Sequence, residues 1–303
     1  MDLASAKKRV GRDQLLWIDV NDPRSETIEA LSGAVGLEPP IDARLAEVPA
    51  RADLTRFPDW IHLTVFAFEP DGEGAEPARR IDLIAASGMV VSVHRGPSSA
   101  VQRFEDRVEG ESRRGLLDAA GFLAGIVDEV ITGYFEAAES IEQEIEKLDE
   151  IALRGRRSDD VLASIVALRR RIGRLRRTLA PHRDPFSALA RPEMELHEEL
   201  GRPWPGLAAR LDRALDAVEN MRDRLLGTYD IHMGRTAQHS NDVMKALTVL
   251  SAVLLPSVVV AGVMGMNFKM EFFEQVNNFW IVIGSMATLA IGILVTARWR
   301  GWI

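Results

Sequence analysis

The stretch ALTVLSAVLLPSVVVAGVMGMNF, residues 246–268, decides the fold of this chain. It contains 23 residues without a charge, and a second uncharged stretch of 23 residues follows at 275–297. A helix rises about 1.5 Å per residue, so each stretch can cross a hydrocarbon core about 30 Å thick. Only residues 269–274 separate the two, which leaves no room for a domain between them. The sequence therefore predicts two membrane-spanning helices that are joined by a tight turn.

The charges around the two spans predict their orientation. Lys245 precedes the first span and Arg298 and Arg300 follow the second, whereas the turn carries Glu271 and Glu274 against one lysine. Lysine and arginine close to a span favour the cytoplasmic side. We therefore expect a multi-pass protein of the cell (inner) membrane whose amino-terminal and carboxy-terminal parts are both cytoplasmic. Aromatic residues mark both borders of the spans, namely Phe268, Phe272, Phe273, Phe279, Trp280, Trp299 and Trp302.

The composition limits the kind of ligand and partner. The chain has 303 residues, a formal net charge of -8 and no cysteine. The lack of cysteine excludes thiolate metal sites, and the acidic balance argues against nucleic acid as a partner. Six arginines lie within residues 169–177, which could suggest a nucleic-acid surface. A charge match within a helical hairpin uses the same residues without a polyanion, and we prefer that interpretation.

The first hundred residues predict an α/β domain. Short runs rich in branched and aromatic residues, typical of strands, occur at 15–20, 60–68, 80–86 and 89–94. A helix is expected over 25–35, because Asp22 and Pro23 precede it and Gly36 follows it. The strand patterns stop before residue 116, so the domain should end within residues 96–115.

The next region predicts a helical hairpin and then a long stalk helix. The apolar residues that recur at helical spacing in the hairpin are Ile141, Ile145, Leu148, Ile151, Ile165, Leu168, Ile172, Leu175 and Leu179. With its turn near Arg156, the hairpin would bring the acidic residues 136–150 alongside the basic residues 169–177. Farther on, Leu211, Leu215, Val218 and Leu225 repeat at helical spacing, and no proline occurs between Pro205 and Pro256. One continuous helix could run from this region into the first span. Gly227, Gly234 and the polar residues 236–241 weaken the prediction of helix there. A helix of this length would need identical neighbouring helices to support it.

One face of the first span is a candidate pore lining. Asn241, Met244, Thr248, Ser251, Leu255 and Gly262 fall near this face. Small residues form separate stripes that suit close helix packing in lipid: Ser257, Ala261 and Gly265 in the first span, and Gly284, Thr288 and Gly292 in the second. Pro256 frees the carbonyl of Ala252, so a mild kink is expected there.

Residues 241–248, Pro256 and residues 261–268 together resemble the pore helix of CorA-type divalent metal cation (magnesium) transporters, the two-transmembrane class with a Gly-Met-Asn motif. The resemblance extends to the layout of the whole chain. It implies a homopentamer with a cytoplasmic α/β funnel, a long pore helix, and an outer ring formed by Gly265, Met266 and Asn267 that receives hydrated metal.

The resemblance also implies roles for single residues. Asn267 would hold the hydrated ion and Gly265 would offer its carbonyl, while Asn241, Met244, Leu247, Leu255 and Gly262 would line the pore, with Leu247 and Leu255 as hydrophobic constrictions. Three departures from the family pattern are present. Met264 replaces a common Tyr, the outer loop has Met270-Glu271 without the usual Pro, and the basic tail is short. Glu271 or Glu274 would replace the loop carboxylate that attracts cations. No regulatory metal site can be assigned.

These observations predict an α+β architecture: a cytoplasmic α/β domain, a helical coiled-coil or stalk region and two carboxy-terminal transmembrane helices, assembled as a pentameric funnel. The expected ranges are 1–115 for the α/β domain, 116–200 for the hairpin, 203–245 for the stalk, 246–268 and 279–297 for the spans, 269–278 for the outer loop and 298–303 for the cytoplasmic tail.

The predicted function is a channel, not an enzyme. It would move divalent cations, Mg²⁺ first and also Co²⁺ or Ni²⁺, into the cytoplasm down their electrochemical gradient, with no cofactor. Two alternatives stay open. A zinc transporter of the same superfamily, with or without proton coupling, could use His232 and His239, which lie seven residues apart. A membrane-anchored scaffold or sensor would conduct nothing.

Overall fold

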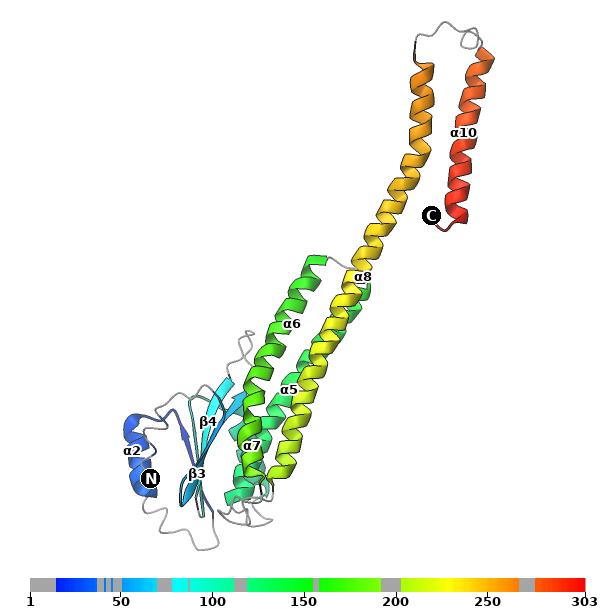
Figure 1. Cartoon of the computed structure of the whole chain (residues 1–303). Coiled ribbons are helices and arrows are strands. Elements are labelled where there is room, and N and C mark those ends of the chain that lie inside the picture. The colour runs from blue at the N-terminus through cyan, green and yellow to red at the C-terminus, as the bar shows by residue number, and fades with distance from the viewer. Residues whose placement is uncertain are drawn as a thin grey trace. The chain divides into compact units, whose positions relative to one another are not determined.

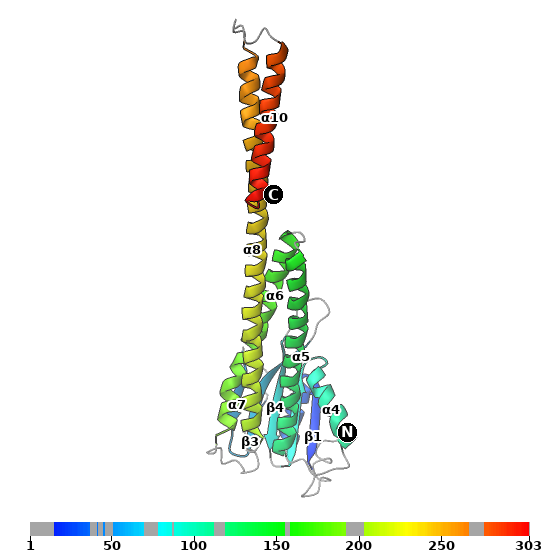
Figure 2. The same cartoon turned by 90° about the vertical axis from the view of Figure 1, so that its right-hand side faces the viewer.

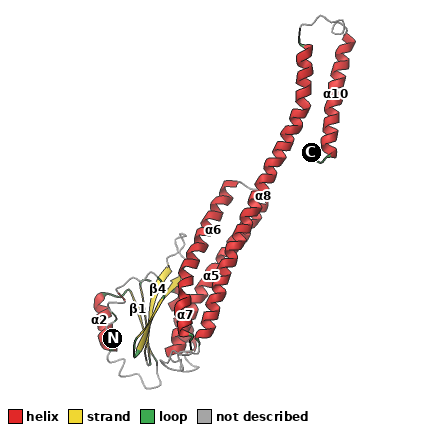
Figure 3. Ribbon diagram, in the orientation of Figure 1, coloured by secondary structure: helices red, strands yellow, loops and turns green. Residues whose placement is uncertain are grey.

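The computed structural model describes residues 15–36, 41, 45, 51–69, 78–86, 88–111, 119–154, 158–191, 203–266 and 276–302. The chain forms two compact units. The first contains Met1–Glu150 and Asp159–Thr228, and the second contains Ile151–Ser158 and Tyr229–Ile303. Among the described residues the strands all belong to the first unit, and only helices and their connections follow β5 (Figure 3). The limit expected within residues 96–115 lies inside the first unit, which holds the sheet and the hairpin except for its turn end, Ile151–Ser158.

The first unit is built on a five-stranded sheet with the strand order β1-β5-β4-β3-β2. Its strands are β1 (Leu16–Asn21), β2 (Asp53–Arg56), β3 (Trp60–Phe68), β4 (Ala78–Ala86) and β5 (Met89–His94). β1 pairs with β5 in parallel, and the other pairs are antiparallel. The four predicted strands are confirmed within two residues at each end. The prediction missed β2, whose four residues begin and end with a charge and pair with β3 alone.

Helices cover both faces of the sheet, with α2 (Ser25–Val35) on one side and the long helices on the other (Figure 1). Ile28 and Leu31 of α2 pack in a core with Ile84 and Val91 of the strands. The predicted bounds of α2 are confirmed, and the helix ends at Gly36 with φ 69°, a left-handed conformation that glycine adopts without strain. On the other face, the Trp17 ring lies 6.0 Å from Phe104 and 5.1 Å from Phe122, centroid to centroid.

The predicted hairpin consists of α5 (Ala119–Arg154) and α6 (Ser158–Leu179), and a 3-10 turn η1 (Ala180–His182) and α7 (Arg183–Leu189) follow it. Eight of its nine predicted core residues are buried, but Ile151 near the end of α5 is 38% exposed. The charge match is confirmed for Arg171, which pairs with Glu144 at 2.5 Å. Other acidic residues of α5 pair elsewhere, because α8 (Trp204–Met264) is a third partner: Glu142 pairs with Arg224 of α8.

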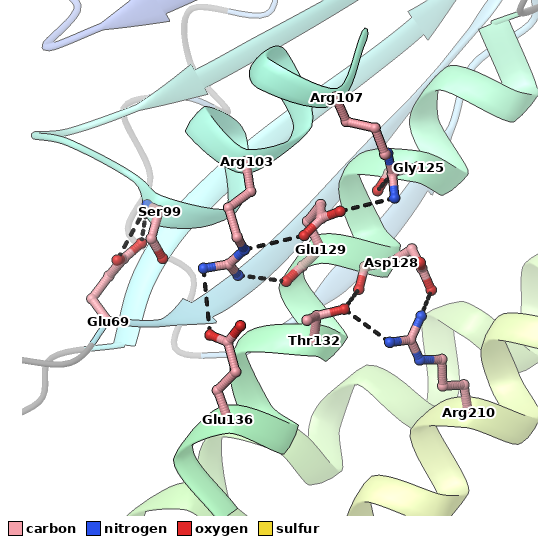
Figure 4. Close-up of polar contacts among 10 residues, drawn as sticks. All are labelled: Glu69, Ser99, Arg103, Arg107, Gly125, Asp128, Glu129, Thr132, Glu136 and Arg210. Carbon is pink, nitrogen blue, oxygen red and sulfur yellow. Dashed lines mark hydrogen bonds and ion pairs between the residues drawn. The ribbon is translucent and has the colours of Figure 1, made fainter. Parts of the chain in front are cut away.

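A polar network holds α4 (Ser99–Glu111), α5 and the first part of α8 together (Figure 4). The carboxylate of Glu129 on α5 accepts Arg103 Nε at 3.1 Å and lies 2.9 Å from an Arg107 nitrogen. Next to it on α5, Arg210 of α8 pairs with Asp128 and donates to the Thr132 hydroxyl at 2.9 Å. Because the Glu129 side chain is only 10% exposed, its two arginines compensate a charge that would be costly to bury alone.

Among the described residues, two helices are long and apolar enough to cross a membrane, α8 and α10 (Val276–Trp299). The weakness expected at Gly227 and Gly234 is wrong, since α8 stays helical through both and through Pro256 over 61 residues. The Thr228 and Thr236 hydroxyls donate to carbonyls one turn earlier, so they do not interrupt the helix. α10 begins three residues before the span expected at 279–297 and ends two residues after it.

Candidate ion-conduction site

The candidate outer ring follows the carboxy-terminal end of α8. There the Gly265 amide donates to the Ala261 carbonyl at 2.9 Å, and the Met266 amide donates to the Val263 carbonyl at 3.2 Å. A Cβ added at Gly265 would lie 3.4 Å from the Ala261 carbonyl oxygen, at van der Waals distance. An alanine therefore fits there within one chain. Asn267 and the loop residues Glu271 and Glu274 lie outside the described residues.

One side of α8 faces α10. Val249 of α8 and Ala297 of α10 are each only 7% exposed. The same side of α8 continues through partly buried residues at spacings of three and four, namely Val253, Pro256, Val260 and Met264. On α10, the matching partly buried residues are Asn278, Val282, Met286, Ala290 and Ile293. The sequence predicts no such contact, although the three-four spacing of these residues is a usable signal.

The predicted pore face lies on the opposite side of α8. At about 3.6 residues per turn, Met244, Leu247 and Leu255 project away from the side that carries Val249. They are 59%, 61% and 68% exposed, so no part of the chain that the structure describes covers them. Asn241, Ser251 and Gly262 are exposed as well. Thr248 is the exception, because it also lines a groove between α8 and α10.

Most of the small-residue stripes lie outside the contact within the chain, although Ser257 is partly buried and Gly292 lines a groove between α8 and α10. Ala261 and Gly265 are exposed, and so are Gly284, Thr288 and Gly292. A Cβ added at Gly284 or Gly292 would meet no atom within 4 Å. The expectation that these stripes pack helices closely therefore stays a prediction for contacts with other chains.

The pore face is chemically neutral. From Ala246 to Met266 no side chain is ionisable. The Thr248 hydroxyl donates to the Met244 carbonyl at 2.8 Å, and the Ser257 hydroxyl donates to the Val253 carbonyl at 3.1 Å. A neutral wall of this kind offers no fixed charge that would trap a divalent cation, so it suits the passage of an ion that keeps its water.

The histidines make structural contacts in the first unit. His62 Nε2 lies 2.9 Å from Asp82, and His182 and His94 bond to backbone carbonyls at 3.0 Å and 2.7 Å. Burial lowers the pKa of His94, but the hydrogen bonds to Asp19 and Gly96 outweigh burial and raise it above its ordinary value.

The histidine pair considered for zinc gains no support from the fold. His232 is 6% exposed, whereas His239 is exposed. Throughout the part of the chain that the structure describes, no group of three or more histidine and acidic side chains is arranged to hold a metal.

Known proteins share this architecture. The family described as CorA-like Mg2+ transporter protein matches residues 12–297. The cobalt/magnesium transport protein CorA of Thermotoga maritima is 24% identical over 95% of this chain and 83% of its own length. The divalent cation transporter CmaX of Pseudomonas aeruginosa is 29% identical over 96% of this chain and 92% of its own length.

The fold is shared with a solved transporter. The complete structure of the CorA magnesium transporter from Methanocaldococcus jannaschii gives a TM-score of 0.81 at 21% identity, over 96% of this chain and 92% of that one. At this level of identity the likeness shows the fold alone. The family match, in contrast, includes the first apolar helix, the Gly265-Met266-Asn267 motif and all but the last two residues of the second apolar helix. The chain belongs to the family of CorA-like Mg2+ transporter proteins.

Proposed function

We propose that the chain is one subunit of a membrane channel that carries divalent cations, Mg²⁺ first and also Co²⁺ or Ni²⁺, into the cytoplasm. One observation carries the proposal. The side of α8 opposite its contact with α10 is exposed, neutral and continuous from Asn241 to Gly262, and it leads to the Gly265-Met266-Asn267 motif. An apolar face of this length needs either lipid or further copies of the same helix as neighbours. A ring of copies turns it into the wall of a pore.

In the proposed assembly, five copies place their α8 helices around one axis in the inner membrane, with both ends of each chain cytoplasmic. The Asn267 amides form the outer ring and hold the ion through its hydration shell, because Mg²⁺ gives up water reluctantly. Glu271 and Glu274 attract cations to the ring. Leu247 and Leu255 form two apolar constrictions, two helical turns apart, that gate by excluding water.

The membrane potential supplies the driving force. Two charges that move through about 100 mV, negative inside, release about 4.6 kcal/mol. Entry therefore requires neither ATP nor a resident cofactor. The direction of transport depends on the orientation that the basic residues at the ends of the spans favour.

Flux into proteoliposomes tests the proposal. We expect Mg²⁺ uptake that follows an imposed potential and falls at least tenfold in Asn267→Ala, with the assembly intact by size-exclusion chromatography. Asn277→Ala is the matched control, because it removes the same amide from an exposed position on α10. Gly265→Ala should also lose transport. Since the added Cβ fits within one chain, such a loss would report on the ring and not on folding.

The same assay separates the alternatives. Zn²⁺ uptake that needs a pH gradient, with little Mg²⁺ uptake, would assign the chain to zinc transport. If no metal is taken up, the non-conducting scaffold becomes the better description. Unchanged Mg²⁺ uptake in both Asn267→Ala and Gly265→Ala would refute the role of the ring.

A further inference from the structure

A groove of about 500 Å³ lies between α8 and α10. Its walls include Val249 and Ala252 of α8 and Gly292 and Ile293 of α10. It lies toward the end of the helix pair where α10 finishes, close to the basic residues that follow the second span. The volume is within the range of ligand sites, roughly 300–1,000 Å³.

The interior of the groove is apolar in effect. Two threonines line it, but the hydroxyls of both are engaged within their own helices: Thr248 donates to Met244 at 2.8 Å, and Thr296 donates to Gly292 at 2.7 Å. Gly292 leaves open space, since a Cβ added there would meet no atom within 4 Å. Such a groove fits a hydrocarbon chain, because the hydroxyl hydrogens of its interior are already bonded within the helices.

The mouth of the groove differs from its interior because of the way α10 ends. Gly301 adopts φ 69°, its amide donates to the Arg298 carbonyl at 3.1 Å, and the Trp302 amide donates to the Ala297 carbonyl at 2.8 Å. These two bonds form a Schellman motif, which turns the chain back over the last helical turn. In Figure 1 this end of the chain turns toward α8. The motif sets Arg300 and Trp302 beside the apolar walls, where both line the groove.

We propose that this groove is a binding site for an anionic phospholipid of the cytoplasmic leaflet. One acyl chain occupies the groove, the phosphate pairs with the Arg300 guanidinium, and the Trp302 ring lies at the level of the headgroups. Basic pockets between transmembrane helices on the cytoplasmic side bind anionic headgroups in this manner, and tryptophan favours the interface. The inference rests on the proposed orientation of the chain and does not require that the chain conduct ions.

Charge complementarity selects an anionic lipid over a zwitterionic one. The carboxy-terminal end of a helix bears partial negative charge, which disfavours a phosphate on its own. Arg300 offsets this charge at the mouth. Arg298, two residues earlier, is exposed and does not line the groove. It has the same side chain and charge as Arg300 and therefore serves as a control for position.

Fluorescence quenching by brominated lipids tests the site. The full-length protein is reconstituted in phosphatidylcholine vesicles that contain increasing fractions of brominated phosphatidylglycerol or brominated phosphatidylcholine. The quenching of Trp302 is obtained as the difference in fluorescence quenching between the wild type and Trp302→Phe. We expect half-maximal quenching of Trp302 at an at least threefold lower fraction of the anionic lipid. Arg300→Gln should abolish the preference and Arg298→Gln should keep it.

A second pair of variants tests the groove itself. Gly292→Leu places a side chain in the groove and should reduce quenching by either lipid at least twofold, whereas Gly284→Leu, at an equally open position outside the groove, should not. Equal quenching of the wild type by both headgroups would overturn the proposal, because it indicates ordinary surrounding lipid. Absence of quenching by either lipid would also overturn it, since a second copy of the chain would then cover the groove. Neither readout uses transport, so a protein that conducts no metal can still pass or fail this test.

Discussion

His182 shows how a single side chain joins the sheet to the helices. Its Nδ1 donates to the Leu179 carbonyl at 3.0 Å, and its Nε2 accepts the Phe66 amide of β3 at 2.9 Å. The ring is 1% exposed and touches neighbouring aromatic rings, among them Tyr134. Both contacts require the neutral ring, because a second N–H would point at the Phe66 donor. Burial accordingly lowers the pKa of His182 to about 4.

This pKa predicts that stability falls in mild acid. The unfolded chain takes up a proton near the ordinary histidine pKa of about 6.5, and the folded chain does so only near 4. The contribution of neutral His182 to the free energy of unfolding is therefore fully present above about pH 6.5. It is lost as the pH falls toward 4, by up to about 3 kcal/mol. Thermal unfolding of detergent-solubilised protein between pH 7.5 and 4.5 would measure the decline.

A variant isolates the histidine responsible. His182→Gln should be less stable than the wild type at pH 7.5, and the difference between the two should shrink as the pH falls. The raised pKa of His94 makes the protein more stable in acid, which opposes the effect of His182. Both proteins contain His94, so its effect cancels in the stability difference between His182→Gln and the wild type. His239→Gln, at an exposed position, is the control and should follow the wild type at every pH. A constant difference between His182→Gln and the wild type would show that another group titrates.

Within α8, two exposed leucines that point in different directions allow the pore wall to be tested against another side of the helix. Leu255 is 68% exposed on the proposed pore face, and Leu250 is 54% exposed about a third of a turn away from that face. Leu255→Ala should widen an apolar constriction and raise Mg²⁺ flux at low driving force by severalfold, because a wider constriction holds water more readily. Leu250→Ala removes the same atoms and should leave the flux unchanged. Stopped-flow flux with a Mg²⁺-sensitive dye would compare them, and equal effects would place the pore wall elsewhere.

For the whole molecule, the exposed apolar side chains of α8 outside the first span predict self-association. Tyr229, Ile231 and Met233 are 37%, 40% and 42% exposed, although they lie well before the uncharged stretch. Five chains of 33.6 kDa give a protein mass of 168 kDa, which native mass spectrometry can resolve from other states. Ile231→Asp should lower this mass by placing a charge in the proposed interface. A single chain in the wild type would refute the pentamer.

The sequence predicts elements whose signals are local. The two spans follow from 23 uncharged residues each, and α2 follows from its apolar spacing and from Gly36, because these features require no knowledge of distant contacts. Ile151 was expected in the hairpin core by its spacing alone. It is 38% exposed because the buried side of α5 continues from Leu148 to Ala152, which is 1% exposed, and Ile151 lies to one side of that line. β2 has a weak pattern of its own and exists through its ladder with β3.

The candidate site was predictable in part. The spacing along α8 identified a face, and the structure places its exposed members opposite the α10 contact. That contact itself, through Val249 and Ala297, depends on how two helices pair and could not be assigned from one stretch alone. The roles of Asn267, Glu271 and Glu274 stay predictions, since these residues lie outside the described part of the chain.

The edge of β3 has a consequence for the fate of the protein during synthesis. The pairing of β2 with β3 ends at Thr64, so the Phe66 backbone lies beyond its reach. The His182 ring accepts the Phe66 amide, and the Tyr134 hydroxyl donates to the Phe66 carbonyl at 2.8 Å. An open strand edge is a template on which another chain can add a strand. Two side chains from the helices occupy that template, so a newly made chain whose helices have docked is protected against edge-to-edge aggregation.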